Sequence, residues 1–126
     1  MNLGNLNRWS PGMQKYVRHM QEEDPATERP YALRYVGSLV ADVHRTMLYG
    51  GIYCYPGDSK NPQGKLRLMY ENNPLAFIVE NAGGAASDGK TRTLEIVPDS
   101  LHQRSPLYIG SREDVRLAEE FLAGTR

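Results

Sequence analysis

Lys65, Arg67 and Glu71 are the residues whose types and spacing best suit a chemical role. In an extended segment Lys65 and Arg67 project from one face, where the arginine fork and the lysine ammonium can both bind phosphate oxygens. Glu71 follows at the start of a predicted helix, where a carboxylate can hold Mg²⁺ that bridges to such a phosphate. The same pattern also fits a solvated strand face beside an acidic helix N-terminus. The pattern alone therefore leaves a phosphate site and a purely structural interpretation open.

Other reactive residues are poorly arranged for chemistry. Asp42 and His44 lie two positions apart on a predicted helix and so point in different directions, which favours a structural role. Cys54 is the single cysteine, and two tyrosines flank it in a predicted strand, which is typical of a small core residue. No Cys/His cluster has zinc spacing, and no phosphate-binding P-loop or dinucleotide glycine fingerprint occurs. The run His102-Gln-Arg104 could contact an anion, but mixed polar residues in a loop before a strand are ordinarily solvated. Phosphate binding is thus the only chemistry that the local patterns indicate.

Length and charge narrow the class of protein. The 126 residues are enough for one domain, 1–126, with its own core. Fifteen Lys and Arg balance fifteen Asp and Glu, which argues against a nucleic-acid partner. No apolar run approaches the ~20 residues of a membrane span, and the first ten residues do not resemble a signal peptide. We therefore expect no membrane association and a cytoplasmic location.

The elements that must position these residues can be read from periodicity. Apolar residues at helical spacing, together with capping residues, predict helices near 11–22, 38–49, 72–82 and 111–122. Short β-prone runs predict strands at 52–55, 85–87, 93–97 and 107–109, with residues 65–70 extended. Ser111 and Asp114 predict a capping box at the last helix. Helices interleaved with short strands indicate an α/β fold, a single layered domain with a mixed β-sheet covered by helices.

Several long runs of the sequence resemble one known family. The runs Arg34 to Pro56 and Gly64 to Phe77 are similar to class I fructose-1,6-bisphosphatase, and the similarity continues through Glu80 to Gly84 and on to the last helix. The stretch GKLRLMYENNPLA, from Gly64 to Ala76, resembles the signature of that family. The resemblance implies the fold of the family's C-terminal domain.

The resemblance also implies roles for particular residues. Asn2, Tyr35 and Tyr55 match positions that hold the 6-phosphate of the sugar, and Arg34 matches an arginine that reaches across a subunit interface into a neighbour's 6-phosphate site. Lys65 matches a residue that contacts the sugar and its 6-phosphate side. Arg67 matches a position beside the 1-phosphate that is cleaved, and Glu71 matches a ligand of Mg²⁺. No residue of the chain is assigned a catalytic role of its own.

The resemblance covers only the C-terminal half of that enzyme. The family's N-terminal domain carries an Asp-Pro-x-Asp-Gly-Ser metal motif, and the nearest string here, Asp24 to Thr27, lacks its second Asp and its Gly. The chain is thus expected to be half of a Mg²⁺-dependent phosphatase that hydrolyses fructose 1,6-bisphosphate to fructose 6-phosphate in gluconeogenesis. Alone it is expected to be inactive, and with the missing N-terminal domain it is expected to form a homotetramer. A non-catalytic sugar-phosphate-binding module, an association module and a sedoheptulose-1,7-bisphosphatase are the alternatives.

Overall fold

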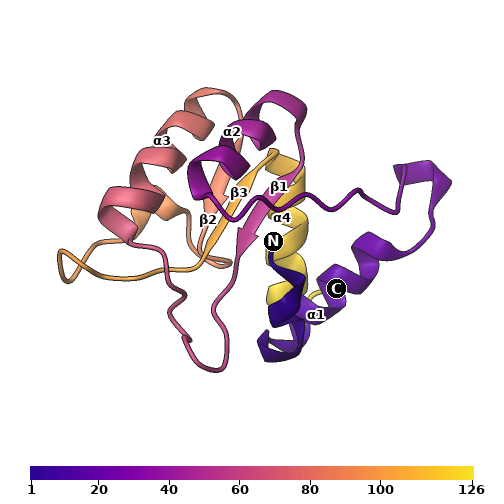
Figure 1. Cartoon of the computed structure of the whole chain (residues 1–126), viewed down its shortest axis with the longest axis horizontal. Helices are drawn as coiled ribbons and strands as arrows, with labels where there is room; N and C mark the ends of the chain where they lie inside the picture. The colour runs from indigo at the N-terminus through magenta and orange to yellow at the C-terminus, as the bar shows by residue number, and fades with distance from the viewer.

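A small sheet forms the centre of the structure, a computed structural model that describes residues 1–126 (Figure 1). Its three strands are β1 (Ile52–Tyr55), β2 (Ala85–Ser87) and β3 (Leu107–Gly110), in the order β1-β3-β2. Both pairings are antiparallel, with Tyr53 opposite Ile109 and Ala86 opposite Ile109 on its other side. The α/β fold is confirmed, but the sheet is antiparallel rather than mixed.

Four helices cover the two faces of this sheet. Their bounds are Pro11–Gln21 for α1, Leu39–Tyr49 for α2, Asn73–Asn81 for α3 and Arg112–Leu122 for α4. Each lies within one or two residues of its predicted position. Helices α1 and α4 pack on one face of the sheet, and α2 and α3 pack on the other (Figure 1).

The alternation of side chains along β1 divides the core into two parts. Cys54 points toward α1 and α4 and packs with Met13, Tyr16 and Phe121. Tyr53 points the other way, toward α2 and α3, and shares its cluster with Val43 and the other residues of that side. The structural role predicted for Cys54 is therefore confirmed, because the thiol is buried in the α1/α4 core.

Local interactions fix the ends and the spacing of α1 and α4. The Ser10 hydroxyl accepts the N–H of Met13 at 3.2 Å, as the predicted N-cap requires. Gly12 lets α1 approach α4 closely, because a Cβ at this position would lie 2.5 Å from the carbonyl oxygen of Phe121. The capping box predicted at Ser111 does not form. Its hydroxyl instead accepts the N–H of Gly51 at 3.0 Å and links the start of α4 to the turn before β1.

Two segments differ from the sequence prediction. Residues 93–97, predicted as a strand, form a 3-10 turn at Thr93–Glu95 with the Thr93 side chain buried. The segment 65–70 is extended only as far as Arg67, after which Leu68–Asn72 forms a π turn. This turn is stabilised because the N–H groups of Glu71 and Asn72 both donate to the carbonyl oxygen of Arg67, at 3.2 and 2.9 Å.

Helices α2 and α3 expose part of the apolar stripes that their sequences carry. Val43 and Val79 are buried against the sheet, whereas Val40 and Ile78 are 67% and 50% exposed. The stripes are thus wider than the sheet can cover. No helix of the structure has the length and apolar character needed to cross a membrane.

Candidate phosphate-binding site

The extended segment that carries Lys65 and Arg67 pairs with a second segment far along the chain. The N–H of Ser105 donates to the carbonyl of Leu66 at 3.0 Å, and the N–H of Leu68 donates to that of Gln103 at 2.9 Å. Leu66 and Leu68 are buried, whereas Lys65 is exposed and Arg67 partly exposed. The predicted separation of charged and apolar faces is therefore present from Lys65 to Leu68.

Glu71 lies directly beside Arg67. Its Oε2 accepts the backbone N–H of Arg67 at 2.7 Å, so the π turn folds the carboxylate back against the extended segment. Asn72, the next residue, is fully buried and donates through Nδ2 to the carbonyl of Ser105 at 3.1 Å. The turn and the segment 103–105 are thus held together, and Lys65, Arg67 and Glu71 form one cluster at this end of the domain.

The guanidinium of Arg67 has unused hydrogen-bonding capacity. Nη1 donates to the carbonyl of Lys65 at 3.3 Å, and Nε is buried without a hydrogen-bond partner. Arg104, from the paired segment, donates through its own Nη1 to the same carbonyl at 3.0 Å. Neither arginine forms a salt bridge. Sequence patterns left His102-Gln-Arg104 open as an anion contact or a solvated loop, and they did not place Arg104 beside Arg67, because they do not reveal which segments pair.

Tyr55, one of the residues expected to bind the 6-phosphate, lies at the end of β1. Burial raises the pKa of the Tyr35 hydroxyl, and Tyr55 and Asp42 raise it further. Asn2 and Tyr55 line one shallow hollow together with Asp58. No contact joins Tyr35 or Tyr55 to Lys65, so a single phosphate pocket for the three remains a prediction.

Asp58, which borders that hollow, is held as a carboxylate by its own loop. Desolvation opposes the charge of Asp58, but the N–H groups of Asn61 and Lys60 donate to its Oδ1 and lower its pKa, with a smaller contribution from the Lys65 ammonium. Gly64, just before Lys65, has φ +71° and is buried, and a Cβ there would lie 3.1 Å from the nitrogen of Pro106. A glycine is thus needed to bring Lys65 past this close contact.

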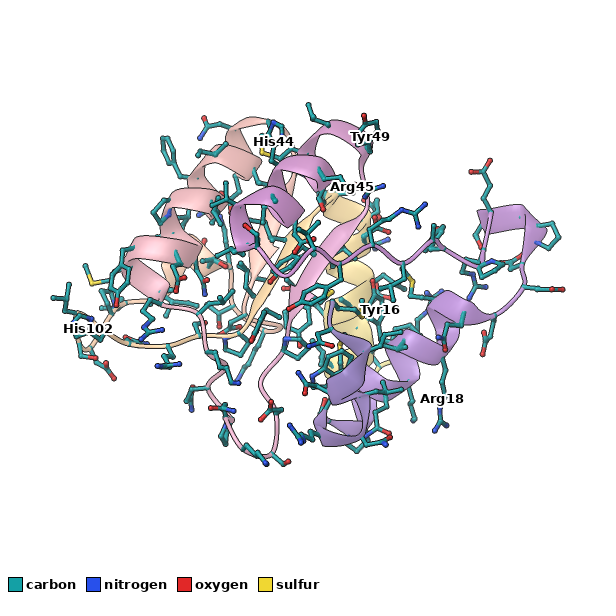
Figure 2. All side chains as sticks on the ribbon, viewed as in Figure 1. Tyr16, Arg18, His44, Arg45, Tyr49 and His102 are labelled. Atoms are coloured by element: carbon teal, nitrogen blue, oxygen red, sulfur yellow. The ribbon has the colours of Figure 1, made fainter.

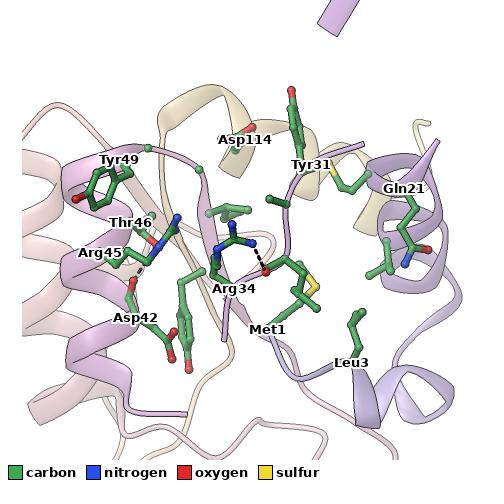
Figure 3. A pocket seen from close by; sticks show the side chains of 18 residues that line it. Met1, Leu3, Gln21, Tyr31, Arg34, Asp42, Arg45, Thr46, Tyr49 and Asp114 are labelled. Atoms are coloured by element: carbon green, nitrogen blue, oxygen red, sulfur yellow. Dashed lines mark hydrogen bonds between the residues drawn. The ribbon is translucent and has the colours of Figure 1, made fainter. Parts of the chain in front are cut away.

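Arg34 lies elsewhere, beside a cavity of about 420 Å³ (Figure 3). Arg34 donates through Nη1 to the carbonyl of Leu33 at 2.8 Å, and Arg45, which also lines the cavity, lies 5.5 Å from the centre of the Tyr49 ring. Lys65, Arg67 and Glu71 do not line this cavity. The structure therefore separates Arg34 from the cationic cluster, and its role in a neighbouring subunit's site stays a prediction.

Asp42 also borders this cavity, and its carboxylate is fully engaged in the protein. Oδ1 accepts the N–H of Val36 at 2.9 Å, and Oδ2 accepts the N–H of Gly37 at 3.1 Å. His44 is exposed on the outer side of α2 (Figure 2). The structural role predicted for the Asp42 and His44 pair is confirmed for Asp42.

Metal ligands are sparse in the chain. Glu71 offers one carboxylate with Oε1 still available, but no group of three or more His, Cys, Asp or Glu side chains could hold a metal ion together. These residues thus do not complete a metal site, and most ligands of any ion at Glu71 would have to come from elsewhere.

Comparison with known proteins identifies the family to which the chain belongs. Residues 1–123 match the family described as "Fructose-1-6-bisphosphatase, C-terminal domain". The whole chain is 59% identical to the class 1 fructose-1,6-bisphosphatase of Chloroherpeton thalassium and 58% identical to that of Chlorobium luteolum. It spans 36% and 38% of the lengths of these curated relatives.

Solved structures agree with this result. The structure of Leishmania major fructose-1,6-bisphosphatase in its T-state superposes with a TM-score of 0.92 at 46% sequence identity, over 98% of this chain and 37% of that one. The holo form of the same enzyme gives a TM-score of 0.89. The chain therefore belongs to the fructose-1,6-bisphosphatase C-terminal domain family, as its sequence indicated.

Proposed function

We propose that this chain is the sugar-phosphate-binding part of a Mg²⁺-dependent fructose-1,6-bisphosphatase. The observation that carries the proposal is the cationic cluster, in which Lys65 and Arg67 share one exposed face and Glu71 is folded against them. A phosphate monoester needs several cationic hydrogen-bond donors, and this cluster offers both an arginine fork and a lysine ammonium. The substrate class, a sugar bisphosphate, is taken from the relatives, which are named fructose-1,6-bisphosphatases.

Each residue then has a distinct task toward fructose 1,6-bisphosphate or its product, fructose 6-phosphate. Tyr35, Tyr55 and Asn2 donate hydrogen bonds to the 6-phosphate, and Lys65 orients the sugar beside it. Arg67 binds the 1-phosphate that is removed. Arg34 projects into the corresponding site of a neighbouring subunit, so the proposal includes a homo-oligomer, which we expect to be the tetramer.

Mg²⁺ would supply charge neutralisation at the 1-phosphate and a water-derived nucleophile. Glu71 is the one residue of this chain suited to hold it, and the remaining ligands would come from the rest of the enzyme. The chain itself contributes binding and orientation. We therefore propose that the isolated chain binds sugar phosphate without hydrolysing it, which is the activity of a non-catalytic binding module.

The outer surface of α2 and α3 supports the need for a further part of the enzyme. Large apolar side chains on this surface are 40% to 67% exposed, namely Val40, Met47, Leu48, Phe77 and Ile78. Exposed apolar patches of this kind mark contact surfaces. We propose that the portion of the enzyme beyond this domain covers the α2/α3 surface.

Binding is tested by titrating ¹⁵N-labelled chain with fructose 6-phosphate and following amide chemical shifts. We expect shifts at Lys65 and Tyr55, and a loss of binding in Lys65→Gln. The matched control is Lys15→Gln, which removes an exposed lysine from α1 and should bind as the native chain does. Equal affinity in Lys65→Gln and Lys15→Gln would contradict the proposal.

Catalytic incompleteness is tested by phosphate release from fructose 1,6-bisphosphate with Mg²⁺. The native chain and Glu71→Gln should both release phosphate no faster than buffer. Robust turnover that disappears in Glu71→Gln would show that the chain completes a metal site by itself.

A further inference from the structure

We infer that Arg67 and Arg104 act as a pair that binds one phosphate group, so that Arg104 is a further substrate-binding residue. The inference rests on the proposed function and adds to it a residue that the sequence patterns did not join to Arg67. It also specifies the ligand, a phosphate monoester dianion that both guanidinium groups contact.

The backbone places the two arginines directly opposite each other. Arg67 and Arg104 are antiparallel partners in an isolated β-bridge, held on either side by the two hydrogen bonds between segments 66–68 and 103–105. Like charges directly opposite one another on paired strands destabilise the pairing. An anion between the two side chains would remove this repulsion.

The side chains of the pair are also directed to one point. Nη1 of Arg67 and Nη1 of Arg104 lie 3.3 and 3.0 Å from the same oxygen, the carbonyl of Lys65. Each guanidinium has five N–H donors, and this carbonyl takes one from each. The other donors of the two groups remain for a ligand.

The balance of charge around the pair favours an anion. Neither arginine has an acidic partner, and the nearby Glu71 carboxylate already accepts the backbone N–H of Arg67. The buried Nε of Arg67 has no acceptor at all. A buried donor without an acceptor costs free energy, so this N–H is explained if an absent acceptor completes the site.

Arg104 is held in place by the loop that precedes it. The Tyr70 hydroxyl lies 2.8 Å from Nδ1 of His102, and the N–H of Asp99 donates to Oε1 of Gln103 at 2.7 Å. The loop is thus tied both to the π turn and to itself. Because the loop is already ordered, little conformational entropy is lost when Arg104 binds a ligand.

A phosphate ester fits these donors better than a carboxylate does. Two neighbouring guanidinium forks offer many donors, and a phosphate monoester has three terminal oxygens, each able to accept more than one hydrogen bond. A carboxylate has two oxygens and satisfies one arginine fork. The pair should therefore prefer phosphate to a dicarboxylate of the same net charge.

The first test needs no variant. The probes are inorganic phosphate and succinate at matched ionic strength, and the readout is the side-chain Nε–H resonance of Arg67 in the native chain. We expect phosphate to shift this resonance downfield, because the Nε–H gains an acceptor, and succinate to shift it much less. No shift with phosphate, or an equal shift with both anions, would overturn the inference.

The second test compares Arg104→Gln with Arg18→Gln, a variant of an exposed arginine on α1. Figure 2 shows Arg18 at the opposite side of the molecule from His102, two residues before Arg104. Arg104→Gln should weaken inorganic phosphate binding about tenfold or more, the effect of losing a charge-assisted contact, and Arg18→Gln should leave it unchanged. Arg104→Lys keeps the charge and should restore part of the affinity.

The outcomes separate this inference from the proposed function. If fructose 6-phosphate binding depends on Lys65 while inorganic phosphate binding does not depend on Arg104, the inference is wrong and the proposed function stands. If inorganic phosphate depends on Arg104 but fructose 6-phosphate binds no more tightly than inorganic phosphate, the arginine pair stands and the proposed function is wrong.

Discussion

The two sides of the sheet differ in how they meet their surroundings. On the α1/α4 side the outer surface is charged, with Lys15 and Arg18 exposed on α1, and with Arg116 paired to Glu113 at 2.8 Å and to Glu120 at 3.7 Å on α4. The α2/α3 side instead exposes the apolar residues described above. The α1/α4 side is therefore complete as a protein surface, whereas the α2/α3 side has the composition of a contact surface.

The strongest test of this contrast removes one phenylalanine from each side. Phe121 is buried and its ring lies edge-on to Tyr16 at 5.8 Å, whereas Phe77 is 62% exposed. Phe121→Ala should lower the free energy of unfolding by about 3–5 kcal/mol, and Phe77→Ala by less than about 0.5 kcal/mol. Urea denaturation of both variants at low protein concentration measures the difference. Comparable losses would mean that the outer surface of α3 contributes to the fold of the isolated chain.

A smaller change tests how tightly the α1/α4 side is packed. In Gly12→Ala the new methyl group meets the carbonyl of Phe121 at 2.5 Å, so α1 and α4 must move apart. We expect a loss of about 1–3 kcal/mol in the free energy of unfolding. The midpoint of urea denaturation reports it. A native midpoint would show that the two helices can separate without cost.

Association should be confined to the α2/α3 side. The native chain should self-associate as its concentration rises, and the double variant Leu48→Lys with Phe77→Lys should remain monomeric, because charges replace two exposed apolar side chains. Sedimentation velocity over a concentration series distinguishes them. Arg18→Gln is the control and should associate as the native chain does. Association that persists in the double variant would place the contact surface elsewhere.

The smallest expected effect is a pH dependence that arises on the α1/α4 side. His19 packs on Phe121 with ring centres 5.0 Å apart, and Nη1 of Arg29 lies 2.7 Å from its Nδ1. Burial first, and then the Arg29 guanidinium, lower the pKa of His19 below its ordinary 6.5, although Glu22 partly opposes this. The unfolded chain thus binds a proton at His19 more readily than the folded chain does.

Because of this difference in proton binding, the free energy of unfolding falls as the pH is lowered. The contribution of neutral His19 to stability is full above about pH 6.5 and is lost as the pH falls from 6.5 through the lower pKa of the folded state. His19→Gln should flatten this part of the stability profile, measured by urea denaturation between pH 5 and 8. His44→Gln, on the exposed side of α2, should leave the profile as it is. A profile unchanged by His19→Gln would assign the dependence to other groups.

Periodicity predicted most of the fold, because each helix and strand has a pattern within its own sequence. The stripe Val115, Ala118 and Phe121 marks α4, and the alternation along Ile52–Tyr55 marks the two faces of β1. The strand predicted at 93–97 is wrong because its β-prone composition serves a buried 3-10 turn. The direction of pairing was also wrong, since it depends on contacts between strands that one sequence does not reveal.

The part of the candidate site that is local in sequence could be predicted, and the part that depends on long-range pairing could not. Lys65, Arg67 and Glu71 lie within seven consecutive residues, so their local pattern indicated a cluster. Arg104 joins them only because segment 103–105 pairs with segment 66–68. Long-range pairing of this kind has no signature in local spacing.

Hydrogen bonds fix both ends of the connector between α1 and α2, and this lowers the conformational entropy that is lost when the connector binds a ligand. The N–H of Tyr31 donates to the carbonyl of Met20 at 3.0 Å, and Asp42 holds the N–H groups of Val36 and Gly37. Between these anchors, the segment Ala32–Tyr35 that carries Arg34 and Tyr35 has fixed ends and an exposed middle. A phosphate or a neighbouring subunit that engages this segment therefore orders only a few residues, because the entropy of closing the loop has already been lost during folding.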